Sequence, residues 1–362
     1  MMSNMFEKIK QGISNIRNSI VQQVNGDINN YGLGYNDVKE ICRDVFRQEF
    51  QIVTKEAVDR LNQIIEEFQE RLLEKIAELE DKDLINKFKE PKFQFILHDT
   101  IKEFAQTEVV ETKEELVDIL LDRLQADENS TEKFVIEEAT HIIPKLTLAQ
   151  SRLLGANLMR RMEGKNLPFI FRRTLQEQAR LYEHLDEITN LDVAYLHQLK
   201  CCEMLPGNIR MATIEEEMRQ RYDLFFREST TMEEYNQYVE AHPILAPGLK
   251  GLALICVDAD NSDRYKMISL SSEHMKDRLE KEGRMDMWED LQAYINTLRP
   301  YSDKEIMNLL IEIHPNWGKL INLYHQENIQ KMSLTPVGMY IANRVVQKEK
   351  MRVAKATLKE LF

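Results

Sequence analysis

The sequence has little glycine and little proline, with 12 glycines and 9 prolines among 362 residues, about half the usual share. This shortage excludes collagen-like, Pro-rich and Gly/Ser-rich chains, and it disfavours a turn-dense β-sandwich or barrel. Leu, Glu, Lys, Arg, Gln and Met are abundant instead, and a hydrophobic share of 43% is too high for a disordered chain. We therefore expect a mainly α-helical protein.

Cysteine and long apolar runs are also scarce. The four cysteines are too few and too scattered for a disulfide framework, and reduced thiols fit a cytoplasmic location. The longest apolar run, residues 251–257, is far shorter than the ~20 residues that cross a bilayer, and no apolar signal-peptide core follows the N-terminus. We expect no transmembrane segment and no obvious route of export.

The motifs of common active sites are missing. The sequence contains neither the G-x-x-x-x-G-K-[ST] nor the G-x-G-x-x-G phosphate loop, and neither the G-x-S-x-G elbow nor the H-E-x-x-H zinc motif. His197 and Cys201 are one helical turn apart, as zinc ligands can be, but no C-x-x-C pair accompanies them. We predict a non-enzymatic protein that has no catalytic or metal-binding residues and needs no cofactor.

Charge is unevenly distributed. The formal net charge of −13 disfavours bulk binding of nucleic acid, yet acids dominate residues 108–140, and bases dominate residues 152–180 and 343–359. These stretches are either solvated helix faces of opposite sign, complementary patches between subunits, or a local anionic site. The candidate anionic-ligand patch consists of basic residues from the two basic stretches: Arg160, Arg161, Arg172, Arg173, Arg344, Lys348, Lys350 and Arg352.

Residues 1–35 combine an amphipathic helix with a hairpin signal. The helix would pack on a partner helix or lie on a membrane surface. Asn25-Gly26 suits a type I′ turn, so residues 20–24 and 28–31 either pair as strands completed by other subunits or form a plain loop. The candidate oligomerisation residues in this segment are Phe6, Ile9, Ile13, Ile16, Ile20, Asn25, Gly26, Ile28 and Tyr31.

Residues 36–90 lack glycine and proline and predict one long coiled-coil-like helix. Its apolar seam needs a partner, which is either another part of the chain or a second copy. The seam repeats at spacings of three and four residues: Leu61, Ile65, Phe68, Leu72, Ile76 and Leu79.

The remaining residues predict two further domains. Residues 91–242 form a helical middle domain, whose helices and those that follow start at capping boxes beginning at Thr112, Thr147, Thr213, Thr231 and Ser302. Prolines and glycines between Pro243 and Gly251 mark the next boundary. Residues 243–362 end in the order strand, turn, helix, which predicts a winged-helix-like α+β domain.

Three blocks of sequence carry a resemblance to a known family. They are Asn25-Gly-Asp-Ile-Asn-Asn-Tyr-Gly32, the segment from Pro91-Lys-Phe-Gln94 to Pro144-Lys-Leu-Thr147, and Leu334-Thr-Pro-Val-Gly338. With them the chain resembles an uncharacterised family of bacterial cytosolic proteins found near phage-defence genes. The second block is also loosely similar to abortive-infection proteins of the alpha type. The resemblance implies a defence context and carries no active site with it.

These observations favour a self-associating, non-enzymatic protein of bacterial antiviral defence, acting as sensor, scaffold or effector. Its expected partners are further copies of itself and a protein or a phage component. One alternative is a nucleic-acid-binding regulator that uses the C-terminal bases Arg344, Lys348, Lys350, Arg352 and Lys355. The other is a membrane-damaging effector that acts through its N-terminal helix, by peripheral membrane contact.

Overall fold

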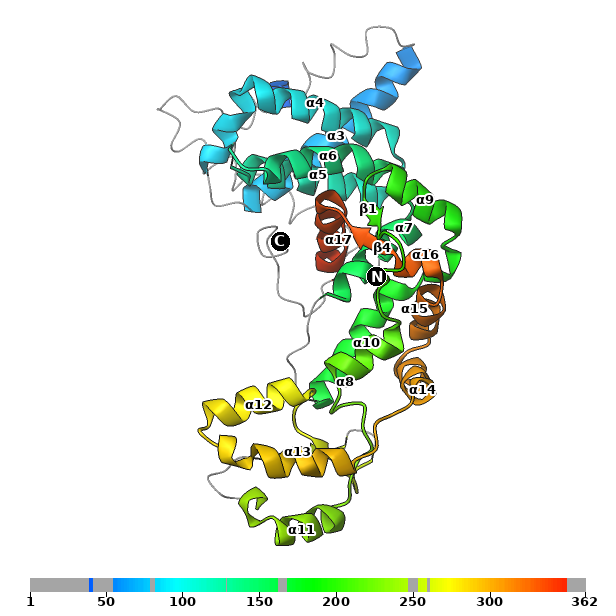
Figure 1. Ribbon diagram of the computed structural model, residues 1–362. Coiled ribbons are helices and arrows are strands. Elements are labelled where there is room, and N and C mark those ends of the chain that lie inside the picture. Colours follow the sequence, from blue (N-terminus) through cyan, green and yellow to red (C-terminus); the bar gives the residue numbers. More distant parts are fainter. Residues whose placement is uncertain are drawn as a thin grey trace, which may run out of the picture. The chain divides into compact units, whose positions relative to one another are not determined.

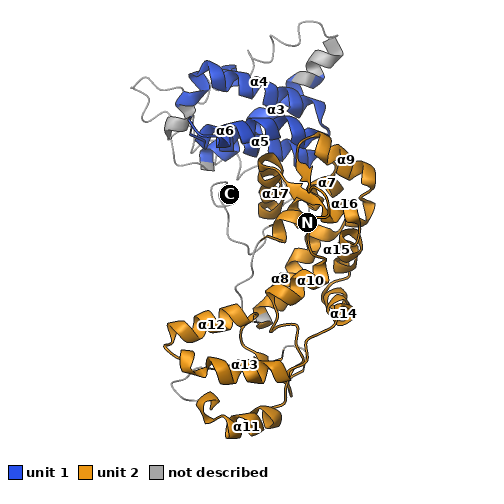
Figure 2. Ribbon diagram, in the orientation of Figure 1, with its two compact units in different colours: residues 1–146 blue, residues 147–362 orange. Residues whose placement is uncertain are grey.

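The computed structural model describes residues 39–41, 55–78, 82–127, 129–161, 168–246, 253–258 and 261–349. Within these residues the chain is mainly helical with a few short strands, which confirms the mainly α part of the predicted fold class (Figure 1). The chain divides into two compact units, residues 1–146 and 147–362 (Figure 2). This division differs from the domain layout expected at residues 35, 90 and 242.

Unit 1 is built from helices that share one core. Its elements are α3 (Lys55–Glu78), the 3-10 helix η1 (Lys82–Lys89), α4 (Pro91–Gln106), α5 (Val110–Gln125), α6 (Glu132–Ile142) and the 3-10 helix η2 (Ile143–Lys145). The single helix predicted for residues 36–90 is therefore wrong at its C-terminal end, because α3 stops at Glu78. Proline fits the first turn of α4, where Pro91 lacks only an N–H that would have no helical acceptor.

The core of unit 1 joins α3, α4 and α5. Phe68 and Leu72 of α3 are fully buried with Phe104 of α4 and with Leu116 and Leu120 of α5. The rings of Phe68 and Phe104 meet edge-on, with centroids 5.1 Å apart. Three helices thus bury one apolar face each against the others.

Ion pairs between α3 and α5 define how these two helices run. Arg60 lies 3.0 Å from Glu108 just before α5, and Arg71 lies 3.2 Å from Glu114. Lys75 pairs with Asp118 one turn further along both helices. The pairs advance in the same direction along both helices, so α3 and α5 are parallel. Bases of α3 thus neutralise part of the acidic stretch of residues 108–140. Each exposed pair adds little stability, but the series fits only one register.

Unit 2 contains more helices and all the named strands. Its first half comprises α7 (Leu148–Met159), α8 (Pro168–Gln178), η3 (Ala179–Tyr182), η4 (Leu185–Glu187), α9 (Asn190–Gln198), β1 (Cys202–Met204) and α10 (Ile214–Arg221). An inserted group follows: α11 (Met232–Ala241), η5 (Pro243–Leu245), β2 (Ile255–Val257), β3 (Tyr265–Met267), α12 (Ser272–Lys281), η6 (Met285–Met287) and α13 (Trp288–Thr297). The last elements are α14 (Asp303–Ile313), α15 (Asn316–Tyr324), α16 (Glu327–Gln330), β4 (Met332–Leu334) and α17 (Pro336–Lys348).

Capping boxes set the starts of several helices. The predicted boxes at Thr147, Thr213, Thr231 and Ser302 are confirmed, each with reciprocal bonds between the cap side chain and the residue three positions later. The predicted box at Thr112 is wrong, because α5 already begins at Val110.

The last strand and helix close onto the start of unit 2. Strand β4 pairs antiparallel with β1, so that Ser333 lies opposite Glu203, and α17 packs along α7. The predicted order of strand, turn and helix is present, with Thr335 capping α17. Its partner strand, however, is β1, which lies in the segment assigned to the middle domain.

Residues 224–298 form a lobe with its own hydrophobic core, inserted between α10 and α14. Tyr235 of α11, Leu245, Met275 of α12 and Leu291 of α13 are all buried in that core. Residues on both sides of the boundary predicted near position 243 therefore pack together. The described end of the apolar run at residues 251–257 is the strand β2, which pairs antiparallel with β3.

Candidate functional site

Most of the predicted N-terminal oligomerisation residues lie outside the described part of the chain. These are Phe6, Ile9, Ile13, Ile16, Ile20, Asn25, Gly26, Ile28 and Tyr31, and the seam residue Leu79 lies outside it as well. The self-association predicted for this segment stays a prediction.

The described seam residues find their partner inside the chain. Ile65, Phe68 and Leu72 are at most 3% exposed in the core of unit 1, and Ile76 packs partly buried against that core. Leu61 also lies in α3. Of the two partners that the sequence left open, a neighbouring part of the same chain covers this seam.

Each described arginine of the predicted anionic patch already takes part in an interaction within the chain. Arg172 of α8 lies 3.5 Å from Glu312, and Arg173 pairs with Glu177 one turn further along the same helix at 3.1 Å. The Arg161 guanidinium donates to the Ser333 hydroxyl at 3.1 Å. Arg344 and Lys348 of α17 take part in interactions too, whereas Lys350 and Arg352 lie outside the described residues.

Arg160, another arginine of the patch, is buried in a polar cluster. Its Nε donates to a Glu217 carboxylate oxygen at 2.6 Å, its Nη2 donates to the Ala212 carbonyl at 2.6 Å, and its guanidinium lies 4.1 Å from the centre of the Tyr324 ring. Burial lowers the pKa of Arg160, but interactions with Tyr324 and Glu217 outweigh it and raise that pKa. Burial also raises the pKa of neighbouring Tyr182 far above its usual range. The cluster holds its charges in fixed pairs, and a cavity of about 20 Å³ beside it admits no more than a water molecule.

A larger hollow of about 750 Å³ opens between α9 and α16. One face of α9 lines it with Asn190, Val193 and His197, and Met204 of β1 lines it as well. Glu327, Asn328 and Lys331 line it from α16 and the residue that follows, and the Lys331 ammonium donates to the Glu327 carboxylate at 2.6 Å.

A second hollow of about 360 Å³ continues on the other side of the same ion pair. Glu327 and Lys331 line it together with His325 and with Asn208 and Arg210. Asn208 and Arg210 belong to the loop between β1 and α10, which is fixed at each end: Leu205 N–H donates to the Lys331 carbonyl and Met211 N–H to the Gln330 carbonyl, both at 2.7 Å. We call the two hollows together the α9–α16 trough.

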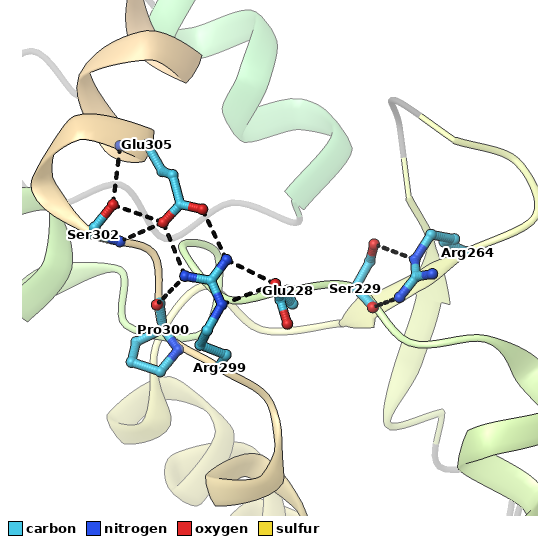
Figure 3. A network of polar contacts seen from close by, with 7 residues as sticks. All are labelled: Glu228, Ser229, Arg264, Arg299, Pro300, Ser302 and Glu305. Atoms are coloured by element: carbon cyan, nitrogen blue, oxygen red, sulfur yellow. Dashed lines mark hydrogen bonds and ion pairs between the residues drawn. The ribbon is translucent and has the colours of Figure 1, made fainter.

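A branched ion pair joins the inserted lobe to α14 (Figure 3). Arg299 donates to Glu228 at 2.7 Å and to both carboxylate oxygens of Glu305, at 2.8 and 3.0 Å, while the Glu305 carboxylate also accepts the Ser302 hydroxyl and N–H. Hydrogen bonds to Arg299 and Ser302 hold the pKa of Glu305 well below its usual range. This ion-pair cluster holds together the segment that enters the lobe, at Glu228, and the segment that leaves it, at Arg299.

No group of three metal-ligating side chains occurs among the residues that the structure describes. Cys201 and Cys202 are buried, and burial raises the pKa of each thiol to about 12. Both are therefore protonated at neutral pH and poor ligands. Within the same described residues, no helix has the length and apolar character required to cross a membrane.

The trough was not predicted from the sequence. The spacing of Asn190, Val193 and His197 places them on one face of a helix, which is a signal, but Glu327 and Lys331 are more than a hundred positions away in the chain. The antiparallel pairing of β1 with β4 and direct packing of α9 against α16 bring the two segments together.

The fold defines a mainly helical protein in which a two-stranded sheet joins distant segments of its second unit. A protein-family model matches residues 32–360, and the chain belongs to the family that this model describes; the description is a bare "-like" designation that names no activity, substrate or partner. Neither a comparison with curated proteins nor one with solved structures finds a match to the chain.

Proposed function

We propose that the chain is a self-associating, non-enzymatic protein of bacterial antiviral defence, acting as sensor, scaffold or effector through homo-oligomerisation. The defence context rests on the resemblance of the three sequence blocks described above. Self-association is the part that the geometry of unit 1 supports.

The supporting observation is a pair of exposed aromatic side chains on two helices that pack against each other. Phe95 of α4 is 73% exposed and Phe134 of α6 is 60% exposed, although the core between these helices is closed. Val109 and Val110, at the start of α5, are more than half exposed as well. Large apolar side chains left in water favour an interface, because burying each phenylalanine gains about 1.5–3 kcal/mol.

The test is the mass of the full chain by multi-angle light scattering across a range of concentrations. We expect a mass above one 42.7 kDa chain at micromolar concentration. In the double variant Phe95→Glu/Phe134→Glu, we expect the concentration needed for assembly to rise by about a hundredfold or more, because two buried rings become two charges.

The matched control is Val257→Glu, which places the same charge on a 52%-exposed apolar residue of unit 2. The control should assemble as the unchanged chain does. A mass of one chain at every concentration would contradict the proposal, and assembly unaffected by the double variant would remove Phe95 and Phe134 from the interface.

The nucleic-acid alternative has less support from the described residues. Arg160, Arg172 and Arg173 each lie beside a carboxylate of the same chain, so their charge is in part already compensated. The membrane alternative depends on residues 3–24, which lie outside the described residues.

A further inference from the structure

The α9–α16 trough has the dimensions of a binding site for a chain segment. Its hollows of about 750 and 360 Å³ share Glu327 and Lys331, so they adjoin each other at this ion pair. A cavity that encloses a small molecule has a similar volume but closes around its ligand. A long depression open to solvent suits an extended ligand better.

The backbone of β1 offers hydrogen-bonding groups beside the trough. Thr335 N–H donates to the Cys201 carbonyl and Leu205 N–H donates to the Lys331 carbonyl. In an antiparallel pair these contacts alternate, so the N–H and C=O of Met204, which lines the trough, point away from β4. In the part of the chain that the structure describes, no backbone group pairs with them across a sheet. An exposed strand edge of this kind accepts a further strand.

The charge along the trough is basic, although the whole chain is acidic. Arg210 is exposed and lies near enough to Glu327 to help lower the pKa of that carboxyl. His197 lines one hollow, whereas His325 in the other already contacts the Glu215 carboxylate at 3.1 Å. The single lining carboxylate is Glu327, which Lys331 already neutralises and whose pKa is lowered by that contact. The basic side chains that remain can donate hydrogen bonds to the carboxylates of a ligand.

We propose that the α9–α16 trough binds an extended acidic peptide, which lies along the outer edge of β1 with its carboxylates near Arg210. Apolar side chains are exposed in and near these segments: Met204, which lines the trough, is 37% exposed, and Leu191 and Ile209, next in sequence to the lining residues Asn190, Asn208 and Arg210, are 78% and 59% exposed. None of the residues that line the two hollows is tyrosine, phenylalanine or tryptophan, on which unpaired bases would stack. The lining therefore favours a peptide over a single-stranded nucleic acid. This inference stands on unit 2 and is independent of self-association through unit 1.

The test is fluorescence anisotropy of a fluorescein-labelled nonapeptide of alternating Glu and Val, titrated with the full chain at 50 mM salt. We expect the acidic peptide to bind at least tenfold more tightly than the same peptide with Lys in place of Glu. Arg210→Glu should weaken binding about tenfold, because it replaces attraction by repulsion in the trough. Ala194→Trp, on the exposed face of α9 that lines the trough, should block binding by filling it.

The control is Arg173→Glu, the same charge change at a 63%-exposed arginine on α8, which should bind as the unchanged chain does. Circular dichroism of each variant shows that it is folded, and the light-scattering mass of the same samples reports self-association separately. Equal binding of the acidic and basic peptides, or binding that survives both Arg210→Glu and Ala194→Trp, would overturn the inference. The inference would also be overturned if oligo(dT) displaced the labelled peptide and the chain bound the peptide no more tightly than oligo(dT).

Discussion

At the scale of single residues, a close contact with the backbone explains why the segment Leu334-Thr-Pro-Val-Gly338 ends in glycine. Gly338 follows Thr335 and Pro336 in the first turn of α17, where its N–H donates to the Thr335 hydroxyl at 3.1 Å. A Cβ on Gly338 would lie 1.8 Å from the carbonyl oxygen of Cys201, an impossible contact with backbone. The glycine thus permits α17 to lie against the end of β1.

Gly338→Ala should therefore destabilise the protein severely. We expect the free energy of unfolding to fall by about 3 kcal/mol or more, because the helix or the strand must shift. Gly318→Ala is the control, since its Cβ would meet only the Ile311 side chain at 3.6 Å and alanine favours a helix by about 1 kcal/mol. Urea denaturation followed by circular dichroism measures both, and equal stability of the two variants would refute this account of Gly338.

At the scale of elements, local signals were predicted from the sequence and long-range pairings were not. Thr147, Thr213, Thr231 and Ser302 each cap a helix through contacts three residues away, so a short stretch of sequence is enough to indicate them. The pairing of β1 with β4 joins segments separated by more than a hundred residues. Its register depends on packing of α17 and α7, for which no short sequence pattern exists.

The joint of the inserted lobe combines backbone hydrogen bonds with ion pairs. Glu228 N–H donates to the Arg299 carbonyl at 3.0 Å and Tyr301 N–H donates to the Phe226 carbonyl at 2.9 Å, so two crossings pair as short extended segments. Arg299 then binds Glu228 and Glu305 over this pair. Backbone and side-chain bonds therefore hold the same joint.

Arg299→Ala should loosen that joint. We expect hydrogen exchange of the amides of Glu228 and Tyr301 to accelerate several-fold, while Arg173→Ala, which breaks an exposed pair on α8, leaves them unchanged. Because the pKa of Glu305 is depressed in the folded protein, the contribution of its carboxylate is present above pH 4.5, the ordinary value, and is lost only as pH falls through the depressed pKa. The difference between variant and unchanged protein should thus persist at pH 4.5; its disappearance there would contradict this assignment.

At the scale of the whole molecule, the prolines and glycines of residues 243–251 indicated a domain boundary, but they did not indicate which parts of the structure it separates. Pro243 and Gly251 mark a connection inside the inserted lobe, whose core contains residues from both sides of it. The division into units falls instead between Leu146 and Thr147, where Thr147 caps α7 and Pro144 lies in η2 just before it. A lone proline beside a helix cap is a weaker signal than the cluster of prolines and glycines at residues 243–251, so composition favoured the wrong boundary.

This division leads to a prediction about the two units as separate proteins. Each has a closed hydrophobic core of its own, so residues 1–146 and residues 147–362 should each be produced in folded form. We expect the sum of their circular dichroism spectra to match that of the full chain. Self-association should be found with residues 1–146, which contain Phe95 and Phe134, and acidic-peptide binding with residues 147–362, which contain the trough. A folded second unit that assembles by itself, or a first unit that binds the peptide, would show that these two properties have been assigned to the wrong units.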